Sequence, residues 1–129
     1  MWQFLEDSPA IGITVSNPLL DPSGERSEPM VAVIDTGFSG FLFVPEGVFE
    51  RLGFSELRAS SRTGRLVEGS SLKLRAAFGR IQIQEVDLSL DGEVYTCRGA
   101  EETLVGMAGL RDLAVTLDSC QKRSSVRVC

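Results

Sequence analysis

Short apolar runs that end at turn residues recur along this sequence of 129 residues. One of them, Val31–Ile34, is rich in β-branched side chains and stops at Asp35-Thr36-Gly37, which predicts a buried strand that enters a tight turn. Runs of the same kind occur at Ile11–Val15, Phe41–Val44, Leu72–Leu74, Gly79–Val86, Leu88–Leu90, Val94–Thr96, Thr103–Gly106, Val115–Leu117 and Val126–Val128. So many short strands predict an all-β, barrel-like domain.

The segments between these runs predict one or two short helices and several turns. Pro45 favours the first turn of a helix that Gly53 ends, and Leu110–Leu113 is typical of a single helical turn. Asp91-Gly92 predicts a hairpin turn, and Pro18–Pro29 a polar loop. The helices are accessory to an architecture made of strands.

Composition limits the classes of protein to which the chain can belong. The length and a hydrophobic content of 43% fit one domain, residues 1–129, with one core. A net charge of −5, with only short basic runs, argues against nucleic acid as a partner. No run is long and apolar enough to span a bilayer, and Glu6, Asp7 and Pro9 interrupt the region where a signal peptide needs an apolar core. We therefore expect a cytoplasmic protein without a membrane partner.

The sequence contains no histidine, which excludes Ser-His-Asp and Cys-His catalysis and removes the commonest zinc ligand. Hydrolytic chemistry would have to use carboxylates, hydroxyls, thiols or lysine, and we expect no metal and no organic cofactor. The three widely spaced cysteines, Cys97, Cys120 and Cys129, fit reduced thiols better than a disulfide framework, although one pair could oxidise.

Two motifs stand about 70 residues apart, each at the end of an apolar run. The first is Asp35-Thr36-Gly37, and the second is Leu104-Val105-Gly106, which precedes the predicted helical turn. Alone, Asp-Thr-Gly is a weak signal, because Asp and Gly are ordinary turn residues. Its position between Val31–Ile34 and the apolar segment Phe41–Val44, together with the second motif, makes it more informative.

Over Val31–Asp118 the sequence resembles the retropepsin-like aspartic proteases, most closely the small prokaryotic proteins whose motif reads Asp-Thr-Gly-Phe. The resemblance implies a closed β-barrel with a single lobe and an aspartic endopeptidase activity. It implies that Asp35 is the catalytic aspartate, that Thr36 bonds across a dimer axis, and that Gly37 lets two loops approach. It also implies that Leu104, Val105 and Gly106 brace the catalytic loop.

The resemblance further implies a flap whose tip is near Glu68, with substrate contacts from Phe38, Ser39, Leu66, Val67, Glu68 and Gly69. Leu66 and Val67 would close apolar side chains over a peptide. The charges of Glu68 and its neighbours fit a solvated hairpin equally well. Phe38 departs from the small or hydroxyl residue of the best-known relatives, which makes the size of the pocket and the ionisation of the carboxyl depend on where its ring lies.

Peptide hydrolysis by carboxyl groups requires two of them. One removes a proton from water while the other protonates the substrate, and two carboxyls within hydrogen-bonding distance share a proton. The chain has a single Asp-Thr-Gly, so the second carboxyl is expected from an identical copy, in a homodimer that binds a peptide substrate. The segment Ser125–Val128 is expected either to join the subunit interface or to form an ordinary edge strand.

Two alternatives remain open at the level of the sequence. The first is a dimeric peptide-binding or scaffold module of the same fold without catalysis, which Phe38 and the charged hairpin favour. The second is a monomeric β-domain in which Asp35 is a surface turn residue. The aromatic side chains Phe41, Phe43, Phe49 and Phe54 are interpreted as core more readily than as a substrate groove.

Overall fold

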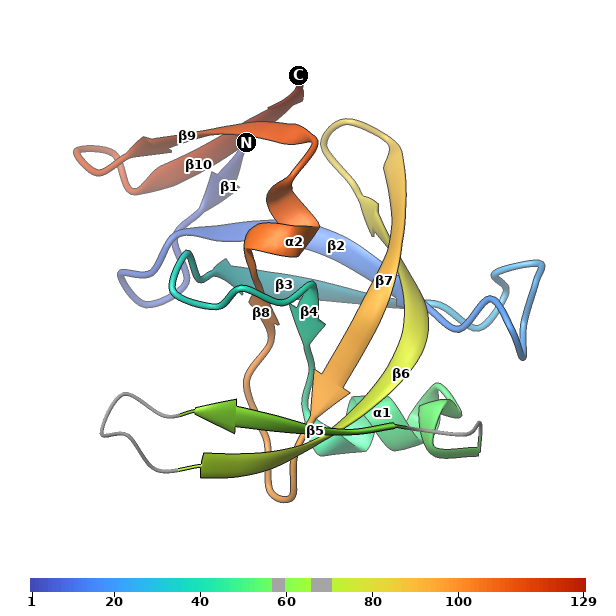
Figure 1. Ribbon diagram of the computed structural model, residues 1–129. Helices are drawn as coiled ribbons and strands as arrows, with labels where there is room; N and C mark the ends of the chain where they lie inside the picture. The colour runs from blue at the N-terminus through green and yellow to red at the C-terminus, as the bar shows by residue number, and fades with distance from the viewer. Residues whose placement is uncertain (57–59, 66–70) are drawn as a thin grey trace.

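A computed structural model describes residues 1–56, 60–65 and 71–129 and shows a closed barrel of six strands. The ring of hydrogen-bonded strands runs β2-β3-β8-β4-β7-β6 and closes where β6 pairs with β2 (Figure 1). These strands are β2 (Ala10–Ser16), β3 (Glu28–Ile34), β4 (Leu42–Phe43), β6 (Ser71–Ile83), β7 (Leu88–Thr96) and β8 (Leu104–Val105). The predicted closed all-β barrel with short helices is confirmed.

Strands outside the ring extend the barrel at two ends. Strand β5 (Ser60–Arg65) pairs with β6 and forms a hairpin that projects from one end (Figure 1). At the other end lies a three-stranded sheet in the order β1-β10-β9, formed by β1 (Trp2–Gln3), β9 (Leu113–Asp118) and β10 (Arg123–Val128). Strand β10 lies between β1 and β9, but β1 pairs only with Arg123 and Ser124. Among the described residues, the segment Ser125–Val128 therefore pairs with β9 alone, as an edge strand of its own subunit's sheet does.

The helices are short. Helix α1 spans Glu46–Arg51 and follows Pro45, and Gly53 ends this region with a φ of +75°, a conformation that glycine adopts without strain. A 3₁₀ turn, η1 (Phe54–Glu56), comes next, and α2 spans Met107–Leu110 directly after β8. Within the described residues, no helix is long and apolar enough to cross a membrane.

One buried cluster fills the barrel and extends beneath α1. Its largest fully buried side chains are Phe49, Phe54, Ile11, Ile13, Leu42, Ile81, Ile83, Val15, Val44, Val94 and Val105. The rings of Phe49 and Phe54 pack with their centroids 5.3 Å apart, and Phe41 is 3% exposed. The interpretation of these three aromatic residues as core is thus correct, and burial of each stabilises the barrel by roughly 1.5–3 kcal/mol.

Three sequence-based boundaries are wrong. The pair Asp91-Gly92 does not turn but lies in the middle of β7, opposite Arg80 and Gly79 of β6, and the turn falls at residues 84–87. Asp91 forms an ion pair with Arg80 across the strands, and a Cβ on Gly92 would lie 2.5 Å from the ring of Phe41. The pair Asp-Gly is typical of turns, but here the aspartate has a charge partner on the neighbouring strand and the glycine leaves space for an aromatic ring.

The second wrong boundary concerns the helical turn predicted at Leu110–Leu113. The helix begins earlier, at Met107, and Leu113 is already the first residue of β9. Both leucines are 8% exposed. The chain turns between them, from α2 into the terminal sheet. The loop predicted at Pro18–Pro29 also ends earlier, since Glu28 and Pro29 belong to β3.

Candidate active site

The loop that carries Asp35 connects β3 to β4, and β8 lies between these two strands (Figure 1). Strand β8 pairs in parallel with β3, where Ile34 is opposite Val105, and antiparallel with β4, where Leu42 is opposite Val105. The main-chain N–H of Asp35 donates to the carbonyl oxygen of Val105 at 3.0 Å, and that of Gly106 donates to Phe41 at 3.1 Å. Both ends of the loop are thereby attached to one two-residue strand.

The carboxyl group of Asp35 is held by its own turn. Its Oδ1 accepts the N–H of Gly37 at 3.0 Å, and its main-chain carbonyl accepts the N–H of Phe38 at 3.2 Å. Asp35 is half-buried, whereas Thr36 and Gly37 are exposed. Among the described residues, the Thr36 hydroxyl has no hydrogen-bond partner. The motif thus presents a fixed carboxylate beside two exposed residues.

Gly106 lies where the loop and β8 approach most closely. A Cβ at this position would lie 2.3 Å from the carbonyl oxygen of Gly40 and 2.5 Å from that of Phe38, too close for any other residue without a backbone shift. The first residues of α2 continue the contact, since Met107 donates its N–H to Phe38 at 2.8 Å and Ala108 donates to Gly40 at 3.1 Å. The structure therefore brings Leu104-Val105-Gly106 directly beneath the Asp35 loop.

Gly37 contrasts with Gly106. It does not adopt a positive φ, and a Cβ on it would meet only Oδ1 of Asp35, at the ordinary contact distance of 3.4 Å. As far as residues 1–56, 60–65 and 71–129 are concerned, neither backbone conformation nor space requires glycine at this exposed position.

The ring of Phe38 packs against neighbouring strands near the Asp35 loop. It meets Tyr95 of β7 edge-on, with the centroids 6.0 Å apart and the planes at 76°. Atoms of the ring also lie within 2.6 Å of the Cβ positions that Gly40 and Gly106 lack. The two glycines thus make room for an aromatic ring between β4, β7 and β8, and Ser39 beside it is exposed.

The remaining substrate-contact candidates, Leu66, Val67, Glu68 and Gly69, lie outside the described residues. The strands that lead to them are described: β5 and β6 pair in register from Ser60 opposite Ala76 to Arg65 opposite Ser71. The register agrees with the predicted hairpin up to its last described pair.

A hollow of about 410 Å³ lies along β3, the strand that leads to Asp35. Val31 and Val33 line it from one face of the strand, because alternate residues of a strand face the same side. The other lining residues come from the N-terminal turn and from the segment before β8, and they are Leu5, Glu6, Ser8, Glu101, Glu102, Thr103 and Leu104. Sequence reasoning missed Glu6, Glu101 and Glu102, although the acidic pair next to the Leu104 motif was a usable signal.

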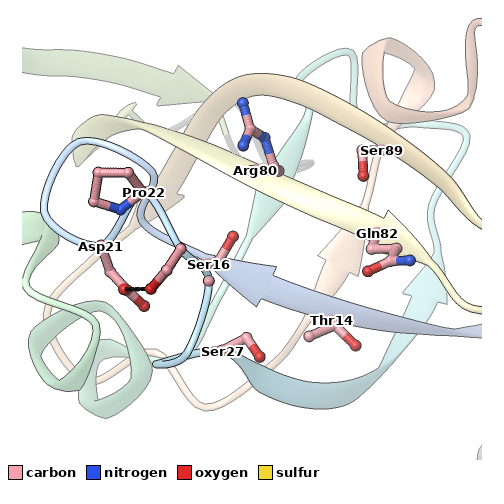
Figure 2. A pocket seen from close by; sticks show the side chains of 10 residues that line it. Thr14, Ser16, Asp21, Pro22, Ser27, Arg80, Gln82 and Ser89 are labelled. Carbon is pink, nitrogen blue, oxygen red and sulfur yellow. Dashed lines mark hydrogen bonds between the residues drawn. The ribbon is translucent and has the colours of Figure 1, made fainter.

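A second, polar hollow of about 230 Å³ lies at the opposite end of β2 (Figure 2). Hydroxyls and amides from β2, β6 and the loop after β2 line it, and they include Thr14, Ser16, Ser27 and Gln82. Arg80 also lines it, but its Nε and Nη2 donate to the carboxylate of Asp91, at 2.7 and 3.1 Å. Six or seven residues of strand, roughly 20 Å, separate this hollow from Asp35, so it is not part of the same site.

Comparison with known proteins yields a relative of similar length, while no family model matches the chain. The relative is a protein of Archaeoglobus fulgidus described as uncharacterized. It is 33% identical over 126 residues, and the matched region covers 98% of this chain and 98% of the relative. The chain therefore belongs to the same family as this Archaeoglobus fulgidus protein.

Proposed function

We propose that this protein is a retropepsin-like aspartic endopeptidase that works as a homodimer, with the carboxyls of two Asp35 residues paired on the two-fold axis. The observation that carries the proposal is the attachment of the Asp35 loop to β8 at both ends, next to the exposed Thr36 and Gly37. A carboxylate at the end of a buried strand, held by a main-chain N–H, is positioned with little freedom to move.

Chemically, the pair would act as both base and acid. Two carboxyls at hydrogen-bonding distance cannot both ionise easily, so they hold one proton between them. The ionised group takes a proton from a water molecule, whose oxygen attacks the peptide carbonyl. The protonated group gives its proton to the carbonyl oxygen, which produces a tetrahedral intermediate with two hydroxyls. The proton taken from water then passes to the leaving amine as the C–N bond breaks.

The requirement for two subunits follows from the single Asp-Thr-Gly of the chain. Two features of the loop support a close approach of a second copy. The Thr36 hydroxyl is exposed, and among the described residues it has no partner in its own subunit. Gly37 is exposed, and the described residues of its own subunit leave space for a Cβ there. Glycine at this position would be explained if a Cβ met the other subunit.

The substrate would be an extended peptide that lies across the Asp35 loop and under the β5–β6 hairpin. Extended peptides bind such surfaces by adding main-chain hydrogen bonds, while alternate side chains enter pockets.

Replacing Asp35 with Asn tests the proposal against a binding module of the same fold. We expect Asp35→Asn to lower the rate of peptide cleavage about 10³-fold or more, since the amide provides neither base nor acid, with an unchanged circular dichroism spectrum. The control is Asp112→Asn, which removes an exposed carboxylate outside the Asp35 loop. Equal cleavage by wild type and Asp35→Asn, or peptide binding by the wild type without any cleavage, would contradict the enzyme assignment.

A further inference from the structure

The hollow along β3 combines apolar walls with acidic residues. Leu5, Val31, Val33 and Leu104 provide the apolar surface, and Glu6, Glu101 and Glu102 provide three carboxylates. Among the described residues, no lysine or arginine lines it. Its volume, about 410 Å³, lies in the range of ligand-binding pockets rather than of packing defects.

The charges around the hollow are not balanced by nearby cations. Within the described residues, no ion pair involves Glu6, Glu101 or Glu102. The neighbouring Asp7 differs, because it is paired with Lys122 and does not line the hollow. Arg98, in the segment before Glu101, is exposed and also does not line it. The hollow therefore carries an excess of negative charge.

The turn that brings Glu6 to the hollow is built in an unfavourable conformation. Leu5 and Ser8 exchange both main-chain hydrogen bonds at 2.9 Å, which leaves Glu6 and Asp7 as the two central residues of a tight turn. Their φ angles are +52° and +80°, a region that favours glycine and asparagine. Glycine would relieve this strain, yet both positions carry carboxylates.

From this combination we propose that the hollow receives a lysine or arginine side chain of the peptide substrate, so that the protein prefers a basic residue within two positions of the scissile bond. The aliphatic part of such a side chain would lie on the valine and leucine surface, while its cationic end would reach the carboxylates and remain hydrated. Val33 lies near the end of β3 and Asp35 follows that end, so the two residues are about 6.6 Å apart along the chain, which matches two residues of an extended peptide. The inference rests on the proposed function, whose substrate class it names.

The experiment uses sets of three fluorogenic peptides that differ at one position, which is lysine, norleucine or glutamate. Norleucine has the aliphatic chain of lysine without the ammonium group, so the comparison isolates charge. Digestion of a proteome-derived peptide library first identifies where peptides are cleaved, and the varied position is then placed within two residues of that bond. We expect kcat/KM for the lysine peptide to exceed that for norleucine by about tenfold at low salt, and the glutamate peptide to be poorest. Added salt should reduce the preference, because the carboxylates are exposed.

The variant Glu6→Gln/Glu101→Gln/Glu102→Gln should lose the preference, so that its kcat/KM for the lysine peptide falls to about that for the norleucine peptide. The matched control is Glu25→Gln, an exposed glutamate in the loop after β2 that does not line the hollow. Cleavage without a lysine preference, or a preference that survives in the triple variant, would overturn the inference and leave the protease proposal intact.

Binding of the same peptides by fluorescence anisotropy separates failure of the two proposals. If the wild type binds the lysine peptide more tightly than the norleucine peptide, and the triple variant does not, the hollow is a basic-residue site whether or not the peptides are cleaved. If nothing is cleaved, the proposed function fails. If the two peptides bind equally, the inference about the hollow fails.

Discussion

The N–H of Asp35 and the carbonyl oxygen of Val105 form a hydrogen bond of 3.0 Å between residues 70 positions apart in the sequence. One residue further along, Gly106 contacts the loop from beneath, where the carbonyl oxygen of Gly40 leaves no room for a Cβ. The position of the Asp35 carboxylate thus depends on β8 as much as on its own turn. Changes in the two motifs should therefore have different and separable effects.

Alanine at the two motif glycines should separate stability from association. Gly106→Ala places a methyl group 2.3 Å from a main-chain oxygen, and we expect it to lower the free energy of unfolding by about 1–3 kcal/mol. Gly37→Ala meets only an ordinary contact, so the stability of one subunit should change by less than about 1 kcal/mol. The same Gly37→Ala substitution should weaken the proposed dimer and its activity. Urea unfolding and sedimentation equilibrium measure the two effects, and unchanged association of Gly37→Ala would contradict close packing at this residue.

Mixing subunits tests whether each active site takes one carboxyl from each of two chains. Wild type and Asp35→Asn, equilibrated in equal amounts, should retain about one quarter of the activity of the same total amount of wild type, because only dimers with two Asp35 residues are active. Independent sites in each chain would retain about one half. The control mixture contains wild type and Asp112→Asn, and it should keep full activity per subunit.

The ion pair between Arg80 and Asp91 predicts a pH-dependent contribution to stability. The hydrogen bond from Arg80, aided by its positive charge, lowers the pKa of Asp91 below its ordinary value. A carboxyl with a lowered pKa in the folded state stabilises the fold at pH values above its unfolded pKa of about 3.9, and this contribution is lost as the pH falls through the folded pKa. Asp91→Asn should therefore lower the Tm at neutral pH, and the difference from wild type should vanish in acid. A Tm difference that persists unchanged in acid would assign the effect to packing.

Cys97 should be the least reactive of the three cysteines. Burial raises the pKa of its thiol, and the carboxylate of Glu46 raises it further, so less of the reactive thiolate is present at a given pH. Cys120 and Cys129 are exposed. With single-cysteine variants at mildly alkaline pH, iodoacetamide should modify Cys97 several-fold more slowly than either of the others, and Glu46→Gln should narrow the gap. Equal rates for all three would show that the thiol is freely accessible.

The sequence alone determined the local elements of this protein. β-branched runs such as Val31–Ile34 indicate strands because their side chains favour extended backbone, and Pro45 and Gly53 mark the start and end of α1 through their own φ preferences. These signals act over a few residues, so they can be recognised without knowledge of the rest of the chain. The all-β class and the turn at Asp35 follow from them.

Only the tertiary structure decided how distant residues combine. Asp91-Gly92 continues a strand because Arg80 and Phe41 lie against it, and no local signal reports either neighbour. The placement of β8 between β3 and β4, and the meeting of Glu6 with Glu101 at one hollow, likewise depend on contacts between residues far apart in the sequence. Such contacts form only when the barrel closes, because closure sets which strands are neighbours.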